Sequence, residues 1–197
     1  MSAFADQKLK VQNDYLGYIV EVELIDFYVV FSKRTMMSQY VQGSFYAATT
    51  FYTDLTSKTK SFEKNRKAAY IGSTMHFFKN LTNNVWNKKE FLLYDGSLPT
   101  DASLFFEVSK ENNITKVTLK EKGNFVTINQ GYNYRRIFNL LFDGSEQSKV
   151  TFRTIEFYVD EFGNHSDIDK IDFSGEISKK RFGDLLPLNF VLPNSDQ

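Results

Sequence analysis

The first third of the chain alternates apolar and polar positions in the way that β-strands do. In residues 16–31, Val20, Val22 and Leu24 would lie on one face of an extended chain, with glutamates at the positions between them. Residues 40–52 form a second run, rich in the aromatic residues and threonines that favour strands. Because only a short polar segment separates the two runs, we expect them to pair as a hairpin.

The pattern becomes helical from residue 57 to about residue 82. Lysine, glutamate, alanine and arginine, which are good helix formers, dominate its first half. Small, apolar and aromatic positions recur close to helical spacing and would form one inward-facing stripe. The stripe consists of Phe62, Ala69, Ser73, His76, Phe77, Asn80 and Leu81. The sequence therefore predicts one long helix that ends near Asn83 and Asn84.

Short runs with strand-like composition fill the rest of the chain, and glycine-centred breaks separate many of them. They cover residues 90–94, 103–108, 114–120, 124–128, 134–142, 149–159 and 170–177. A short helical turn is expected before Pro187. The predicted fold class is α+β: a predominantly antiparallel β-sheet covered by the one long helix (about 57–82), with a short C-terminal helical turn. We expect residues 1–197 to form a single domain, which could be a fragment of a larger exported protein.

Charge and composition restrict the classes of partner. With 42% hydrophobic residues, the chain has enough apolar side chains for a core. Lys+Arg and Asp+Glu are equal at 24 each, so no overall field would draw nucleic acid to the protein. The basic stretch at 58–67 lacks interleaved aromatic residues and is interpreted as a solvated helix face. We therefore expect no nucleic-acid partner; binding that weakens steeply with salt would be the sign of one.

Membrane insertion and thiol chemistry have no support in the sequence. No run approaches the roughly 20 apolar residues of a membrane-spanning helix, so no transmembrane segment is predicted in this chain. The first residues, MSAFADQKLK, also lack the apolar core of a signal peptide. The absence of cysteine excludes disulfides, thiolate metal sites and cysteine nucleophiles.

Motifs of the common enzyme classes are missing. No glutamate stands at the offset that a zinc protease requires from either His76 or His165. His165, Asp167 and Asp169 lack the further acids and the glycine of a calcium loop, so we interpret them as an acidic, solvated turn. Neither a serine-hydrolase elbow nor a phosphate-binding loop occurs. The sequence predicts no metal and no cofactor.

Two interpretations of His76 remain open. Ser73 and His76 would share one helix face, but no acid stands at a helical offset to orient the imidazole. In the first interpretation, Gly72 and Ser73 allow a close approach between helix and sheet, and His76 makes a hydrogen bond at the edge of the core. In the second, His76 is an acid/base catalyst assisted by Tyr70 or Arg66. An open pocket with a carboxylate beside His76 would favour the second.

Three stretches occur in an order found in a known family. They are VQNDYLGYIVEVELIDF at 11–27, NRKAAYIGSTMHFFKNL at 65–81 and SGEISKKRFGDLLPLNFVLP at 174–193. This order resembles the C-terminal region of the carboxypeptidase-like regulatory-domain-containing proteins of Gram-negative bacteria, a family of unsettled biochemical role. The matching positions are Asn13, Leu16, Gly17, Tyr18, Phe27, Asn65, Arg66, Ala69, Tyr70, Gly72, Ser73, His76, Phe77, Leu81, Gly175, Leu185, Leu186, Pro187 and Pro193.

The resemblance implies a bacterial protein of the cell envelope, in the periplasm or at the cell surface. "Carboxypeptidase" refers to a β-sandwich domain that accompanies some peptidases, so the name implies no peptidase site. We expect a non-catalytic, envelope-associated interaction or structural module that binds a protein or glycan partner. The alternative is a hydrolase-like enzyme with a site assembled around His76. Should an open pocket exist there, the motif positions that could form it are Asn65, Arg66, Tyr70, Gly72, Ser73 and His76. The sequence makes no prediction of the oligomeric state.

Overall fold

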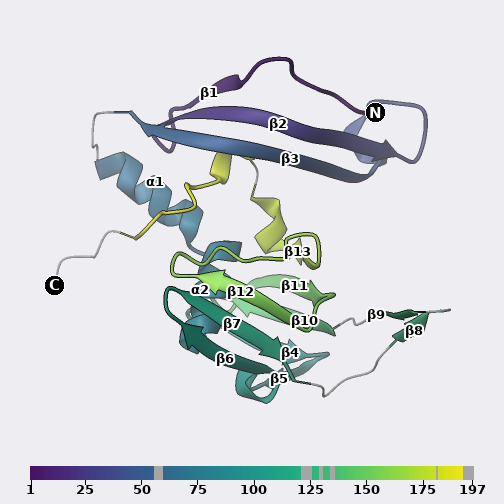
Figure 1. Ribbon diagram of the computed structural model, residues 1–197, viewed down its shortest axis with the longest axis vertical. Helices are drawn as coiled ribbons and strands as arrows, with labels where there is room; N and C mark the ends of the chain where they lie inside the picture. Colours follow the sequence, from purple (N-terminus) through teal and green to yellow (C-terminus); the bar gives the residue numbers. More distant parts are fainter. Residues whose placement is uncertain (56–59, 121–125, 129–130, 134–135, 181, 193–197) are drawn as a thin grey trace. The chain divides into compact units, whose positions relative to one another are not determined.

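The computed structural model of the protein confirms the α+β fold class, with mostly antiparallel strands, two short helices and several 3-10 turns (Figure 1). Contacts along the backbone divide the chain into two compact units, residues 1–65 and 66–197. Each unit is described by itself, and the single domain over 1–197 stays a prediction. The structure describes residues 1–55, 60–120, 126–128, 131–133, 136–180 and 182–192.

The first unit is built on an antiparallel sheet with the strand order β1-β2-β3. Its strands are β1 (Leu9–Asn13), β2 (Tyr18–Phe31) and β3 (Val41–Asp54), with a 3-10 turn at Ser38–Tyr40. The predicted hairpin is confirmed, because β2 and β3 pair along their whole length. In Figure 1 these are the two long strands, drawn in purple to blue.

A β-bulge at Ile25 divides β2 into two halves. Leu24 pairs with Ala48 while Asp26 pairs with Ala47, so Ile25 is the extra residue. Before the bulge, alternate residues of β2 are buried, as the alternating pattern predicts. Beyond it no residue of β2 is fully buried, and Ile25 itself is 69% exposed.

The helical region is two helices rather than the one long helix that the sequence predicts. They are α1 (Lys60–Tyr70) and α2 (Thr74–Asn83); residues 57–59 lie outside the described residues. Gly72 interrupts the helix with φ +70°, a left-handed conformation that glycine adopts without steric cost. The end of α2 agrees with the predicted stop, since Asn84 caps it with φ 54°.

The second unit stacks several antiparallel strands around an aromatic core. A five-stranded sheet has the order β13-β11-β10-β4-β5, a three-stranded sheet has the order β12-β7-β6, and β8 pairs with β9. The strands are β4 (Phe91–Asp95), β5 (Leu98–Thr100), β6 (Phe106–Glu111), β7 (Ile114–Leu119), β8 (Val126–Ile128), β9 (Gly131–Asn133), β10 (Arg136–Phe142), β11 (Glu146–Phe152), β12 (Glu156–Asp160) and β13 (Ile171–Gly175).

Several boundaries differ from the predicted runs. The run at 149–159 is not one strand: it supplies the end of β11 and the start of β12, which belong to different sheets. The run at 103–108 begins as a 3-10 turn, Ala102–Leu104, before β6. Residues 124–125 and 134–135 of two other predicted strands lie outside the described residues. The expected C-terminal helical turn is present as 3-10 turns at Glu176–Lys179 and Phe182–Asp184.

Helix α2 supplies the centre of the second unit's core. Phe77 and Phe78 are fully buried and make edge-to-face contacts with each other. Phe77 also meets Phe91 of β4, and Phe78 meets Phe157 of β12. Because each buried phenylalanine contributes about 3–5 kcal/mol relative to alanine, this cluster fixes α2 against both sheets.

Candidate functional site

The break between the two helices positions His76 in the first turn of α2. Ser73 is the N-cap, and its Oγ accepts a hydrogen bond from the backbone N–H of His76 over 3.2 Å. A Cβ added to Gly72 would lie 3.2 Å from the ring of Phe142 in β10. The close helix–sheet approach that the sequence predicts at Gly72 is therefore present, and it coincides with the helix break.

Both ring nitrogens of His76 are engaged by the protein itself. The backbone N–H of Gly72 donates to Nδ1 over 3.1 Å, and Nε2 lies 2.8 Å from Oε2 of Glu90. Because Nδ1 accepts a hydrogen bond, the proton of the neutral imidazole sits on Nε2 and is donated to the carboxylate.

Glu90 is the carboxylate that sequence reasoning missed. It precedes β4, and its Oε2 also accepts a hydrogen bond from the side-chain amide of Asn80 over 3.0 Å. His76 and Asn80 stand one helical turn apart on α2, so one carboxylate joins two positions of the same helix face. The helical pattern could reveal only an acid on the same helix, whereas Glu90 lies beyond the helix, just before β4.

Burial keeps the imidazole of His76 neutral. Its removal from water lowers the pKa of His76, the positive charge of Lys180 lowers it further, and Glu90 opposes the change. Protonation of Nδ1 would also set its hydrogen against the N–H of Gly72. We therefore assign the group a pKa below that of an exposed histidine.

Tyr70 closes one side of His76. The two rings lie 5.2 Å apart between centroids, and Phe190 from the C-terminal segment meets Tyr70 at 5.8 Å. Burial, with a smaller effect of Glu90, raises the pKa of Tyr70. The side chain therefore stays protonated at neutral pH and is poorly suited to act as a base.

Lys180 is half-buried against the end of α1. Its ammonium donates to the carbonyl oxygens of Ala68 and Ala69 over 3.1 and 2.8 Å. These carbonyls belong to the last turn of α1, where a positive charge is favourable. Burial lowers the pKa of Lys180. The neighbouring Arg181 lies outside the described residues.

Four of the six motif positions, Tyr70, Gly72, Ser73 and His76, gather around the helix break. Asn65 belongs to the first unit, where its side-chain amide donates to the carbonyl oxygen of Tyr15 over 2.7 Å.

Arg66, the sixth motif position, is half-buried in the second unit.

The second histidine, His165, packs at the edge of the hydrophobic core. The ring of His165 stacks on Phe78 of α2 with centroids 4.2 Å apart, and burial lowers the pKa of His165 to about 4. Asp160 shapes the surrounding turn by accepting hydrogen bonds from the backbone N–H groups of Phe162 and Asn164. The turn predicted around His165, Asp167 and Asp169 is present, but His165 is not solvated as the sequence suggested.

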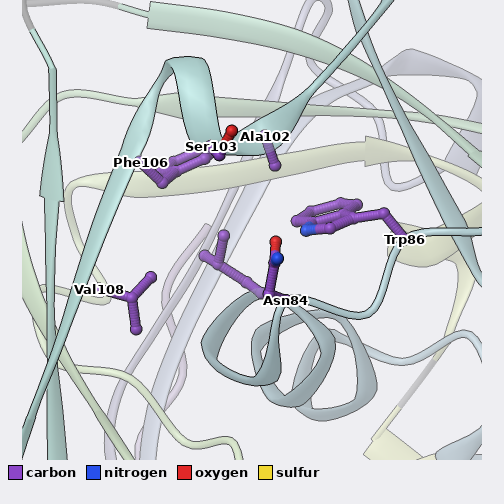
Figure 2. A pocket seen from close by; sticks show the side chains of 7 residues that line it. Asn84, Trp86, Ala102, Ser103, Phe106 and Val108 are labelled. Carbon is purple, nitrogen blue, oxygen red and sulfur yellow. The ribbon is translucent and has the colours of Figure 1, made fainter.

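A cavity of about 240 Å³ lies beside Trp86, away from the contacts of His76. Figure 2 shows Asn84 and Trp86 on one side of it and Ala102, Ser103 and Phe106 on another. Its lining is mostly apolar and is completed by Leu81 and Val108.

One polar atom at this cavity is unsatisfied. The indole Nε1 of Trp86 is buried without a hydrogen-bond partner in the described part of the structure. The cavity is thus an apolar recess with one unsatisfied donor, and its tryptophan is the only one in the chain.

The described residues contain neither a metal-binding cluster nor a spanning helix. Within these ranges, no three side chains of His, Asp or Glu lie close enough to hold a metal ion. None of the helices described has the length and apolarity needed to cross a membrane.

Comparison with protein-family models, curated proteins and solved structures found no significant match to this chain. The resemblance to the carboxypeptidase-like regulatory-domain-containing proteins therefore stays a prediction that rests on the three sequence stretches.

Proposed function

We propose that this protein is a non-catalytic, cell-envelope-associated interaction module that binds a protein or glycan partner. The observation that carries the proposal is the outer edge of β3. The envelope location comes from the sequence resemblance. The chemistry of His76 supports a role other than catalysis, because Glu90 and Gly72 occupy both of its ring nitrogens.

The edge of β3 has one of the features that protect exposed strands, a β-bulge near its start where Gln42 is the extra residue, but it lacks the others. It stands last in the β1-β2-β3 sheet and runs for 14 residues. Residues 41–53 contain no charged side chain and no proline. Such an edge presents unpaired N–H and C=O groups that can hydrogen-bond an added strand.

One hydrogen bond gives the direction of the backbone amides in the part of β3 that pairs regularly with Tyr18–Leu24 of β2, Ala48–Asp54. The N–H of Leu55 donates to the carbonyl oxygen of Gly17 over 3.0 Å, so this opposed pair is a hydrogen-bonded one. Hydrogen-bonded pairs alternate in antiparallel ladders, so Thr49 also bonds β2. The backbone groups of Ala48 and Thr50 point the other way, toward the outer edge of the sheet.

A proline at one of these outward positions tests the proposed function. Ala48→Pro removes an N–H that faces the edge but none that bonds β2, so the sheet should persist. We expect envelope proteins retained by the wild-type chain to be lost by Ala48→Pro. The matched control, Ala48→Val, keeps the N–H and should retain them. Equal retention by all three chains, each with an unchanged circular dichroism spectrum, would exclude β3 as the binding edge.

The cavity beside Trp86 is where a glycan or other small partner would be detected. Because Trp86 is the only tryptophan, its fluorescence reports on that cavity alone. Titration with soluble peptidoglycan fragments should shift its emission if a glycan binds there. An unchanged emission spectrum, together with no heat of binding, would exclude a glycan as the partner. A protein partner would then be the remaining proposal.

A hydrolase-like enzyme is the second candidate, and the His76–Glu90 pair favours it. A histidine oriented by a carboxylate resembles the base and its orienting group in hydrolases. The difficulty is that Glu90 holds the nitrogen that would face a substrate, and Gly72 holds the other.

His76→Ala separates the two candidates. If His76 is structural, the variant loses about 1–3 kcal/mol of stability through unpaired buried groups, and partner binding persists at a temperature where it stays folded. A hydrolytic activity toward ester, peptide or glycoside substrates that is present in the wild type and absent in folded His76→Ala would establish the enzyme instead.

A further inference from the structure

The loop that joins β2 to β3 carries basic and apolar side chains side by side. It spans residues 32–40 and lies at one end of the two long strands (Figure 1). Lys33 and Arg34 are exposed at its start. Met36 and Met37 follow and are 77% and 56% exposed, although methionine is more often found in protein interiors. Two cations and two exposed apolar side chains thus share one short loop.

Hydrogen bonds within this loop hold its backbone in place. The N–H of Ser32 donates to the carbonyl oxygen of Tyr40 over 2.8 Å, and the N–H of Tyr40 donates to that of Met37 over 3.0 Å. The N–H of Thr35 donates to the carbonyl oxygen of Lys33 over 2.8 Å. The ammonium of Lys33 also lies 4.9 Å from the centroid of the Tyr40 ring. Because the backbone is already ordered, the loop would lose little conformational entropy on binding a partner.

No acidic side chain of the surrounding strand segments offsets the charge of the loop. Residues 27–53 contain Lys33 and Arg34 as their only charged side chains. The nearest acid along β2, Asp26, precedes Lys33 by seven positions. At a strand rise of about 3.3 Å per residue, this separation is about 20 Å, which exceeds the screening length of about 8 Å at physiological salt. The loop therefore has a local positive charge although the whole chain has a net charge of zero.

We propose that this loop docks on the surface of an anionic lipid bilayer. Met36 and Met37 enter the boundary between headgroups and acyl chains, and Lys33 and Arg34 contact the lipid phosphates. The loop lies on the bilayer and does not span it. The inference goes beyond the proposed function, because it uses the end of the hairpin rather than the edge of β3 and names a lipid partner.

The combination of charge and apolar surface favours a bilayer over other anionic partners. Nucleic acid would pair with the two cations through its phosphates but would leave Met36 and Met37 in water. Methionine side chains are unbranched and adapt to irregular surroundings, so the loop needs no complementary pocket. The long apolar stems of Lys33 and Arg34 can reach from the acyl boundary to the phosphates. An acidic protein surface is the remaining alternative, and it would bind the loop without lipid.

Co-sedimentation of the full chain with vesicles tests the proposal. Phosphatidylcholine vesicles with about a third phosphatidylglycerol should bind the wild type with an association constant of about 10³–10⁴ M⁻¹, no stronger than one myristoyl chain. Pure phosphatidylcholine should bind roughly thirtyfold more weakly, because each cation near an anionic surface contributes about fivefold. A wild type that sediments with neither vesicle at about 10 mM lipid, or equally with both, would overturn the proposal.

A pair of double variants tests whether the charge acts at the loop. Lys33→Gln combined with Arg34→Gln should weaken binding to the anionic vesicles roughly thirtyfold. The matched control, Lys88→Gln combined with Lys89→Gln, removes the same charge from exposed positions of the second unit and should bind like the wild type. Equal losses in the two double variants would mean that net charge alone attracts the chain, which would overturn docking through the loop.

The apolar contact has its own readout. Met36→Ser combined with Met37→Ser should weaken binding at least about tenfold. Because the chain has no cysteine, Met37→Cys can carry an environment-sensitive dye at one position, with Val11→Cys on β1 as the control. Anionic vesicles should shift the dye emission at position 37 to shorter wavelengths and leave that at position 11 unchanged. No shift at position 37, or equal shifts at both positions, would overturn the insertion of the loop.

An acidic protein partner would give a different set of results. If the wild type binds no vesicles but retains an envelope protein that the Lys33→Gln and Arg34→Gln double variant loses, the loop binds protein and the bilayer proposal is overturned. Ala48→Pro should bind anionic vesicles like the wild type, because position 48 lies outside the loop. The failure of the β3 edge as a binding site and the failure of the loop as a lipid site are therefore distinguishable.

Discussion

His76 is fixed in one tautomer by two short-range contacts. Gly72 donates to Nδ1, and Nε2 donates to Glu90, which Asn80 also contacts. Protonation at Nδ1 would remove the hydrogen bond from Gly72 and would only strengthen the contact with Glu90. The residue therefore stabilises the start of α2 as a neutral donor and acceptor, which is how buried polar groups are normally satisfied.

Stability should fall in mild acid because both histidines resist protonation in the folded state. An unfolded histidine has a pKa of about 6.5, whereas burial lowers the pKa of His165 to about 4 and also lowers the pKa of His76. As the pH falls from about 6.5 toward 4, the unfolded chain takes up protons that the folded chain does not, so the free energy of unfolding decreases. His165 contributes at most about 3 kcal/mol of this loss.

Urea unfolding between about pH 7.5 and about pH 5 measures this dependence. Phe78 stacks on the imidazole ring, so His165→Phe keeps an aromatic ring there while removing the titration. The decrease in free energy should be smaller in that variant than in the wild type. A free energy of unfolding that is constant or rises as the pH falls would contradict the burial of these two groups.

At the scale of elements, the break between α1 and α2 decides how the helical region packs. Gly72 turns the chain in a left-handed conformation, and Ser73 caps the new helix at once. The break changes the direction of the helix axis, so that Phe77 and Phe78 point into the core. A continuous helix from α1 would keep one axis and would place these two side chains elsewhere.

Gly72→Ala should destabilise the protein more than Gly96→Ala does. Both glycines have positive φ, 70° and 62°, so each alanine carries a conformational penalty of about 1–2 kcal/mol. At Gly72 the new methyl group would also press on Phe142, whereas at Gly96 nothing lies within 4 Å. Thermal and urea unfolding of the two variants should show this difference, and equal losses would mean that the contact with Phe142 is unimportant.

The sequence predicts elements best where a local pattern decides them. The alternation around Val20 and Val22 predicts β2, and the asparagines at 83–84 predict the end of α2. The break at Gly72 was missed because glycine and serine also fit a helix that is closely packed. Glu90 was missed because its contact with His76 forms only when β4 returns beside α2. The division of the run at 149–159 likewise depends on tertiary pairing rather than on composition.

At the scale of the whole molecule, the surroundings of His76 and the edge of β3 lead to different conclusions. Both ring nitrogens of His76 are engaged by groups of the second unit, Gly72 and Glu90. By the alternation of the β2–β3 ladder, the backbone groups of Ala48 and Thr50 face the outer edge of the sheet, where Asp54 is the only charged side chain of β3. This edge is the basis of the proposed interaction module.

Amide hydrogen exchange along β3 tests this conclusion most directly. In the dilute chain, the amides of Thr49 and Phe51 bond β2 and should exchange slowly, whereas those of Ala48 and Thr50 should exchange quickly. With a captured envelope partner at saturation, exchange at Ala48 and Thr50 should slow by at least about tenfold. Unchanged exchange at these two amides would contradict the claim that β3 is the binding edge.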